Sequence, residues 1–430
     1  MKVLILDQTH GGDKIGREYL RNGDDVTVVD VYGTMKPKDV QLSRDAGMRC
    51  TIRTPSEHFD LAIVPVHCPD RFLAGASFDE RITHHEAVGR LVRFQMPVIE
   101  VTGAGGKTST CFVLAHVLSS LGKKVLLHTS RGIFGYARRV TTIKEGTSIA
   151  PASLIDLSRI EGYDFAVIEE SLGGCGVGDV CCVTTIGDNY DIAGMTRKAF
   201  DGKVQMITLA KRSVVFPEAE MDLWAPHVRK GVDITSFGAN GDVSVSIATG
   251  QELGVPMVIG IRSAEGTGQI TMPGTYLVPS YRTAFEASIA IVSALKLDVS
   301  KAITSLANFN GVPGRGEIER EGDWYFIRER NPGVSARSIE WNLSMLETMY
   351  NIDDIGLVID PMNVRICEKL DVEAIMKVVS EHPSVRQTYL FERDAADADH
   401  WADLVHIKSV YDDIWANHQV VLWCTKEGFQ

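Results

Sequence analysis

A glycine-rich segment between an apolar strand and a helix constrains this chain more than any other feature. Residues 102–109 read Thr-Gly-Ala-Gly-Gly-Lys-Thr-Ser and follow the apolar run 97–102. Apolar residues at helical spacing come next, and Gly122 stands where that helix would end. The glycines let backbone N–H groups point at phosphate oxygens, and the helix N-terminus adds partial positive charge. This order predicts an α/β fold with a phosphate-binding loop, and an enzyme that binds ATP.

Individual positions of the loop have expected partners. Lys107 can reach the β- and γ-phosphates, and the Thr108 hydroxyl can bind Mg²⁺. Val101 stands where the general form of the loop has a glycine. The alternative, a glycine turn followed by a chance Lys-Thr pair, leaves the strand before it and the helix after it unexplained. We therefore predict an ATP site made of Thr102, Gly103, Ala104, Gly105, Gly106, Lys107, Thr108 and Ser109.

The chain divides into three regions around this loop, within the two to four domains that its length suggests. In the first region, strands alternate with a helix, which is typical of a small Rossmann-like sheet. Its first turn, 8–12, is not G-x-G-x-x-G, so a dinucleotide site is disfavoured. The last region again shows strands and a helix. We predict domains at 1–95, 96–315 and 316–430.

Composition limits the partners of the protein. The formal net charge is −12, which argues against general nucleic-acid binding because that needs a basic surface. The segment Met1–Asp7 lacks the pattern of a signal peptide, and no apolar run reaches the roughly 18–20 residues that cross a bilayer. We therefore expect a cytoplasmic protein without a membrane partner. The eight cysteines lack Cys-x-x-Cys spacing, so we expect reduced thiols rather than a metal site, including at 175, 181 and 182.

The extended form of the loop, Thr-Gly-x-x-Gly-Lys-Thr-Ser-Thr at 102–110, resembles the Mur ligase family. The resemblance implies an α/β, three-domain architecture with Rossmann-like N- and C-terminal domains and a central P-loop ATPase domain. The N-terminal domain would bind the substrate. Such enzymes use ATP and Mg²⁺ to convert a carboxylate into an acyl phosphate, which a nucleophile then attacks.

Other segments match motifs of that family. Glu169 begins a Glu-x-Ser segment whose glutamate holds Mg²⁺, although a solvated strand end remains the alternative. Ser130 is a weaker Mg²⁺ candidate. Lys211 resembles a lysine that is often carbamylated and binds a second Mg²⁺, with an ordinary surface lysine as the alternative. Arg315 resembles an arginine that meets nucleotide phosphate, and Asn331 an asparagine of the third-domain nucleotide loop. The resemblance thus implies four catalytic residues: Lys107, Glu169, Lys211 and Arg315.

The sequence also departs from the family. In the segment 185–191, Tyr190 stands in place of a metal-binding histidine, and a tyrosine is a poor Mg²⁺ ligand at neutral pH. Asp188 or Asp191 could serve instead, or the second metal could be absent. The segment 274–277 lacks the usual His-Asn pair. We therefore expect an altered adenosine site.

Five further segments resemble a branch of the family in methanogenic archaea: Asp7–Gly12, Asp30–Thr34, Thr83–Val88, Arg330–Gly333 and Cys367–Asp371. That branch closes a carbocyclic ring on a nickel tetrapyrrole acid, with a ring carbon as the nucleophile. Such a substrate carries several carboxylates and needs cationic or hydrogen-bonding partners. The candidates are His10, His84, His85, Arg328 and Arg330, although for each residue taken singly an ordinary surface role is favoured over a substrate contact.

Two other functions remain open at the level of sequence. One is a Mur-type amide ligase that joins an amino acid to an acid. The other is a nucleotide-regulated binding module without acyl transfer. The sequence leaves open the oligomeric state, the number of Mg²⁺ ions and the carbamylation of Lys211.

Overall fold

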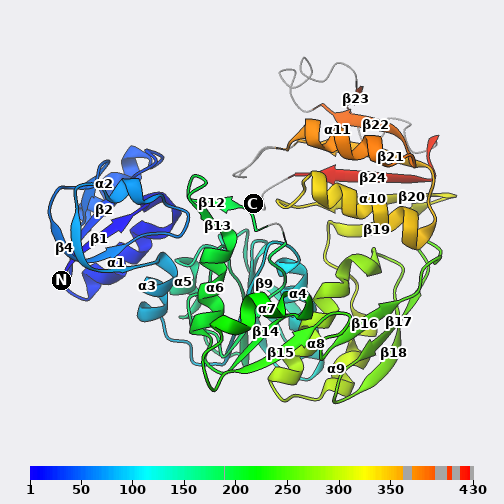
Figure 1. Ribbon diagram of the computed structural model, residues 1–430, viewed down its shortest axis with the longest axis horizontal. Coiled ribbons are helices and arrows are strands. Elements are labelled where there is room, and N and C mark those ends of the chain that lie inside the picture. The colour runs from blue at the N-terminus through cyan, green and yellow to red at the C-terminus, as the bar shows by residue number, and fades with distance from the viewer. Residues whose placement is uncertain (188, 362–369, 393–403, 409–416, 427–430) are drawn as a thin grey trace. The chain divides into compact units, whose positions relative to one another are not determined.

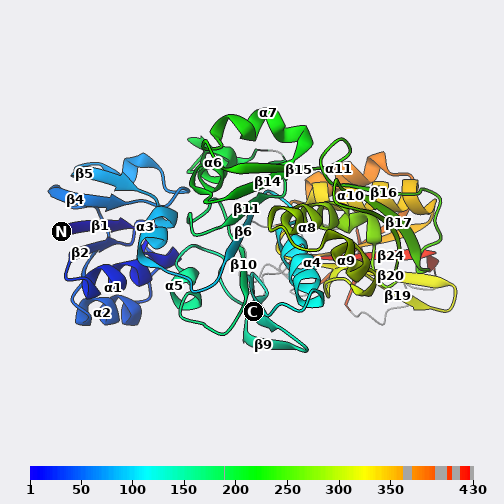
Figure 2. The ribbon, with the colours of Figure 1, turned by 90° about the horizontal axis from the view of Figure 1, so that it is seen from below.

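The computed structural model describes residues 1–187, 189–361, 370–392, 404–408 and 417–426. Backbone contacts divide the chain into two compact units. The first combines Met1–Asp242 with Ala287–Asp298, and the second combines Val243–Glu286 with Val299–Gln430. Helices and strands alternate in both units, so the predicted α/β class is confirmed (Figures 1 and 2).

The first sheet of unit 1 is parallel throughout, in the order β3-β2-β1-β4-β5. Its strands are β1 (Lys2–Leu6), β2 (Asp25–Val29), β3 (Arg49–Thr51), β4 (His58–Ile63) and β5 (Ser77–Ile82). Its helices are α1 (Asp13–Arg21), α2 (Pro37–Asp45) and α3 (His84–Leu91), with short turns at Gln8–Gly12 and Asp70–Leu73. Thr83 and Glu86 form a capping box that starts α3, because each side chain bonds the backbone N–H of the other.

The second sheet of unit 1 has eight strands in the order β15-β14-β11-β6-β10-β7-β8-β9. Six are parallel, and the hairpin β8–β9 is added antiparallel to β7. The strands are β6 (Val98–Thr102), β7 (Val125–Thr129), β8 (Gly132–Tyr136), β9 (Val140–Glu145), β10 (Phe165–Glu169), β11 (Val180–Val183), β14 (Ser213–Pro217) and β15 (Asp233–Phe237). Other elements of this region are α4 (Lys107–Ser120), α5 (Ser153–Leu157), α6 (Ala199–Leu209), α7 (Met221–Trp224), the two-stranded ribbon β12 (Asp191–Ile192) and β13 (Arg197–Lys198), and turns at Glu218–Glu220 and Ala225–His227.

Helix α4 is buried on more than the one face that its apolar spacing predicts. Leu114 and Val117 share the face that this spacing predicts to be buried, and Thr110, Phe112 and Val113 are buried as well. One face of the helix packs on the sheet, and α8 covers another: the Ser288 hydroxyl lies 3.4 Å from the Thr110 carbonyl oxygen. The helix that follows the phosphate loop is therefore packed into the core on more than one face.

Unit 2 contains two sheets. An antiparallel one consists of β16 (Ser244–Ile247), β17 (Met257–Arg262) and β18 (Thr267–Met272). The other has the order β19-β20-β24-β21-β22-β23 and is parallel except for the β19–β20 pair, with strands β19 (Arg315–Glu321), β20 (Trp324–Arg330), β21 (Ile355–Asp360), β22 (Val385–Phe391), β23 (Val405–Ile407) and β24 (Val420–Thr425). The helices are α8 (Arg282–Ala294), shared between the units, α9 (Val299–Ser305), α10 (Ala336–Tyr350) and α11 (Val372–Glu381), with turns at Val278–Tyr281 and Leu306–Asn308.

Several of these elements were not expected from the sequence, among them β19, β20 and α10. The domain boundaries at 95/96 and 315/316 stay a prediction. Among the helices in the described part of the chain, none combines the length and apolar character needed to span a bilayer.

Candidate functional site

The phosphate loop lies where β6 ends and α4 begins, at the carboxyl edge of the sheet. This edge is where open α/β sheets bind ligands. Gly103 has φ +149° and Gly106 has φ +76°, conformations that glycine adopts without strain. A Cβ atom on Gly103 would also lie 2.0 Å from the Thr184 hydroxyl oxygen. The Lys107 ammonium donates to the Gly103 carbonyl oxygen at 3.1 Å, so the lysine folds over its own loop.

Three predicted Mg²⁺ residues meet beside this loop. The Thr108 hydroxyl donates to both oxygens of the Glu169 carboxylate, at 2.9 and 3.0 Å. The Ser130 backbone N–H donates to the same carboxylate at 3.2 Å. These residues come from α4, the end of β10 and the turn after β7, and Glu169 is only 2 % exposed. The alternative of a solvated strand end for Glu169 is therefore wrong.

The residues around Glu169 suit a hard divalent cation. Its carboxylate accepts hydrogen bonds from a hydroxyl and a backbone amide, both of which are uncharged. A buried carboxylate with neutral partners next to a phosphate loop offers the negative charge and oxygen atoms that Mg²⁺ prefers. Ser130 contacts this carboxylate through its backbone N–H.

Glu100 and Glu170 form a pair of buried carboxyl groups. Glu100 on β6 accepts hydrogen bonds from the backbone N–H of Cys175 and Gly178, at 2.8 and 2.9 Å. Burial and the neighbouring Glu100 raise the pKa of the Glu170 carboxyl well above its usual range. The Cys175 thiol donates to Glu170 at 3.4 Å. Burial and the nearby Glu100 thus disfavour the ionised form of Glu170, so we do not assign this carboxyl group to the metal.

The structure corrects the expectation for Lys211. Its ammonium group donates to the Val177 carbonyl oxygen at 2.7 Å, before β11 begins. Strands β6 and β11 run parallel, and the far end of β11, at Val183, pairs with Thr102 at the phosphate loop. Lys211 is thus at the amino edge of the sheet, at least about 10 Å from the loop by strand geometry. A lysine there cannot reach the phosphates.

A different lysine, Lys203 on α6, was missed by the sequence reasoning. Its side chain is almost fully buried, at 1 % exposure, and its ammonium lies 5.7 Å from the centre of the Tyr190 ring. Burial and then the charge of Lys107 lower the pKa of Lys203 to about 7. The signal available in the sequence was a lysine within the mostly apolar segment that forms α6.

Two aspartates were offered as replacements for the missing histidine of the family. Asp191 forms an ion pair with Lys198 at 2.8 Å across the β12–β13 ribbon. Asp188 lies outside the described residues. The Lys203 ammonium lies over the ring of Tyr190, the residue that stands in the histidine position.

Arg315 and Asn331 lie in unit 2 and meet there around one carboxyl group. Arg315 and Glu329 lie opposite each other in the antiparallel register of strands β19 and β20. The Asn331 side-chain amide donates to Glu329 at 3.4 Å, and the Gly316 backbone N–H donates to it at 3.0 Å. Burial raises the pKa of the Glu329 carboxyl to about 7, and the charge of Arg315 partly offsets this effect. The two predicted nucleotide residues thus share a local cluster.

Two of the candidate substrate histidines lie in the interior. His84 and His85 are 1 % and 3 % exposed. Their ring N–H groups donate to the carbonyl oxygens of Leu6, at 2.8 Å, and Ser171, at 2.9 Å. Burial lowers the pKa of each ring to about 4. Both rings are therefore neutral near pH 7 and tie α3 to its neighbours, so we withdraw them as substrate contacts.

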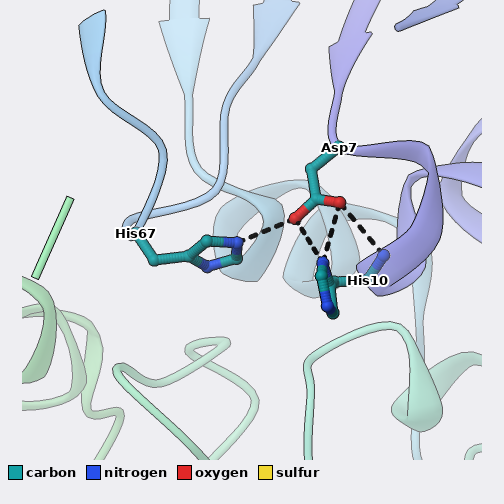
Figure 3. Close-up of side chains that lie close together, drawn as sticks. All are labelled: Asp7, His10 and His67. Atoms are coloured by element: carbon teal, nitrogen blue, oxygen red, sulfur yellow. Dashed lines mark hydrogen bonds and ion pairs between the residues drawn. The ribbon is translucent and has the colours of Figure 1, made fainter. Parts of the chain in front are cut away.

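The other candidates are accessible. The His10 side chain is 50 % exposed and lies beside Asp7 and His67 at the carboxyl end of β1 (Figure 3). Arg328 pairs with Glu319 at 3.2 Å, and Arg330 is exposed at the end of β20. Of the segment Cys367–Asp371, the residues 367–369 lie outside the described part of the chain.

Comparisons with known proteins agree on the architecture. The structure resembles a UDP-N-acetylmuramoylalanyl-D-glutamyl-2,6-diaminopimelate–D-alanyl-D-alanyl ligase from Acinetobacter baumannii, with a TM-score of 0.59, 17 % identity, and 94 % of this chain and 86 % of that chain covered. It also resembles the MurF ligase of Thermotoga maritima in complex with ADP, with a TM-score of 0.59, 15 % identity and coverage of 94 % and 91 %. The fold is therefore that of a Mur ligase. No protein-family model matches the chain.

Sequence comparison is more specific. The coenzyme F(430) synthetase of Methanosarcina acetivorans is 30 % identical over 370 residues, which cover 79 % of this chain and 78 % of that protein. The coenzyme F(430) synthetase of Methanocaldococcus jannaschii is 29 % identical over 232 residues, covering 50 % and 51 %. The match to this first relative, together with the fold, defines an ATP-dependent ligase of the Mur type. Within that class, the chain belongs to the coenzyme F(430) synthetase family.

Proposed function

We propose that this ligase closes the carbocyclic ring of a nickel seco-hydrocorphinate acid, the coenzyme F(430) synthetase reaction. ATP would phosphorylate a propionate side chain, and a ring carbon of the same molecule would attack the acyl phosphate. ADP and phosphate would leave. The observation that carries the proposal is the 30 % identity to a coenzyme F(430) synthetase over most of both chains.

The phosphate site supports the first half of this reaction. Lys107 would neutralise the transferred phosphoryl group, and Thr108, Ser130 and Glu169, which lie together beside the loop, would hold Mg²⁺. When bound, Mg²⁺ supplies charge neutralisation at the phosphate oxygens. Arg315 and Asn331 remain proposed nucleotide contacts.

We assign to Lys203 the role that the sequence suggested for Lys211. A lysine whose pKa is about 7 is partly unprotonated near neutral pH, and this is the form that reacts with CO₂ to give a carbamate and a proton. The resulting carboxylate would offer oxygen ligands to a second Mg²⁺. Burial at 1 % exposure would protect it from hydrolysis.

A cavity of about 440 Å³ at the carboxyl edge of the first sheet supports an acidic substrate in this region. Gln8 follows β1, and Asp30 follows β2. Arg44 and Arg53 also line the cavity and offer positive charge to a carboxylate. His10, Arg328 and Arg330 remain as further proposed contacts.

The test is incubation of the protein with Mg·ATP and the nickel seco-acid, without any amine. We expect one ADP per substrate, a product lighter by one water and a shifted visible spectrum. The amide-ligase alternative predicts strict dependence on an amine and a product that carries an added amino acid. ATP binding without ADP formation, with this acid and other acids, would instead support a binding module.

A further inference from the structure

Asp7, at the carboxyl end of β1, orients two imidazole rings. Its side chain is fully buried. Both carboxylate oxygens lie 2.9 Å from His10 Nδ1, and one lies 2.7 Å from His67 Nε2 (Figure 3). Because a carboxylate accepts hydrogen bonds, each ring places its N–H toward Asp7. The remaining nitrogen of a neutral His10, Nε2, therefore carries a lone pair.

The backbone also holds this arrangement in place. Asp7 has φ +62°, which is unusual for a residue other than glycine and tends to persist at functional sites. Its carbonyl oxygen accepts from the Gly12 backbone N–H at 3.2 Å, and its side chain accepts from the His10 backbone N–H at 3.2 Å. A carboxylate that fixes the tautomer of a partly exposed histidine is the arrangement that prepares an imidazole to accept protons.

A single segment connects this cluster to the phosphate site. The Ser171 backbone N–H, two residues after Glu169, donates to the Ile149 carbonyl oxygen at 3.1 Å. Three residues further on, Ala152 packs so closely on Gly11 that a Cβ atom on Gly11 would lie 2.7 Å from its side chain. Three residues span at most about 11 Å. The cluster beside Gly11 thus lies within reach of one large substrate that also occupies the phosphate site.

We infer that His10 Nε2 accepts the proton that the attacking ring carbon releases, with Asp7 as the positioning residue. The inference rests on the proposed function. A carbon–carbon bond forms between the ring carbon and the activated carboxyl carbon. The bond from that carboxyl carbon to the phosphate oxygen breaks, and phosphate leaves with the electron pair. The ring carbon loses its hydrogen as a proton, which moves to His10.

The electrostatics agree with this role. The hydrogen bond to Asp7 raises the pKa of His10 above its ordinary value, with a smaller contribution from Asp30. A raised pKa makes the neutral imidazole a stronger base, which suits general base catalysis. The ring is half exposed, so a substrate can reach Nε2.

The test separates acyl phosphate formation from ring closure. His10→Gln is incubated with Mg·ATP and the nickel seco-acid, with hydroxylamine present or absent. Hydroxylamine traps the acyl phosphate as a hydroxamate. We expect hydroxamate formation within about threefold of the wild type, and ring closure slower by about 100- to 10,000-fold. His58→Gln is the matched control, because His58 also contacts a carboxylate, Asp79 at 3.3 Å, but at the amino end of β4.

Ring closure by His10→Gln at the wild-type rate would overturn the inference. So would equal losses of hydroxamate and ring closure, which indicate a role in binding or folding. Asp7→Asn should lower the ratio of ring closure to hydroxamate in the same direction, by a smaller factor. If the wild type forms neither ADP nor hydroxamate with this acid, the proposed function itself fails, and the inference falls with it.

Discussion

The hydroxyl of Thr108 donates to both carboxylate oxygens of Glu169, at 2.9 and 3.0 Å, although 61 residues separate the two in the chain. The contact links the first turn of the phosphate-loop helix to the end of a neighbouring parallel strand. A Mg²⁺ ion bound there would have the Thr108 hydroxyl and the Glu169 carboxylate as neighbouring oxygen ligands.

Replacing Glu169 by glutamine should weaken Mg²⁺ binding, since the side chain keeps its shape but loses its charge. We expect the Mg²⁺ concentration for half-maximal ATP turnover to rise on the order of tenfold or more. Glu145→Gln, on the exposed strand β9, is the control and should leave the Mg²⁺ titration unchanged. An unaltered titration for Glu169→Gln would reject its role as a metal ligand.

Lys107→Ala should strongly lower the turnover of ATP while the protein stays folded. The lysine supplies charge at the phosphates, and losing such a donor costs about 100- to 1,000-fold in rate. Its hydrogen bond to Gly103 is within the loop, so the melting temperature should change little. Wild-type ATP hydrolysis in this variant, measured with substrate present, would refute the assignment.

Lys203 and Lys211 give opposite expectations for the same substitution. Lys203→Ala should lower turnover by about 100-fold, whereas Lys211→Ala, at the amino edge of the sheet, should stay within about twofold of the wild type. Lys203→Arg should not restore activity, because an arginine stays charged and cannot form the carbamate. Equal losses at both positions would contradict the placement of the site. Carbon-13 NMR with labelled CO₂ tests the carbamate directly.

Gly103 and Gly105 should differ in their tolerance of a side chain. Gly103→Ala would force a Cβ atom to 2.0 Å from Thr184 at a φ of +149°, which should cost about 1–3 kcal/mol of stability. At Gly105 no atom lies within 4 Å of the added Cβ. Thermal denaturation of the two variants measures the difference. A Gly103→Ala protein as stable as Gly105→Ala would show that the loop has another conformation.

Acid should destabilise the protein through its buried histidines. Burial lowers the pKa of His84, His85 and His128 to about 4, whereas the unfolded rings titrate near 6.5. As the pH falls from about 6.5 to 4, these histidines bind protons in the unfolded state but stay neutral in the native state. Each histidine then costs up to about 3 kcal/mol. His85→Gln should therefore show a shallower loss of melting temperature over this range than the wild type. Parallel curves would mean that His85 titrates normally in the folded protein.

The sequence by itself determined the strand, loop and helix at 97–122, because glycine conformation, apolar spacing and a helix N-terminus are local properties of the chain. It also predicted that Thr108, Glu169 and Ser130 bind Mg²⁺, and the structure brings these three residues together. Only the tertiary structure separated Lys203 from Lys211, which lie eight residues apart in sequence. One is buried close enough to Lys107 for that charge to lower its pKa, and the other lies at the far edge of the sheet.

The tertiary structure alone also brought His67 to Asp7 and turned His84 and His85 inward. A histidine on a short helix carries no local signal for which way its ring points, since that depends on which sheet packs against the helix. Local residues therefore encoded the phosphate loop. The packing of segments far apart in the chain decided which polar side chains became buried supports and which remained open to a substrate.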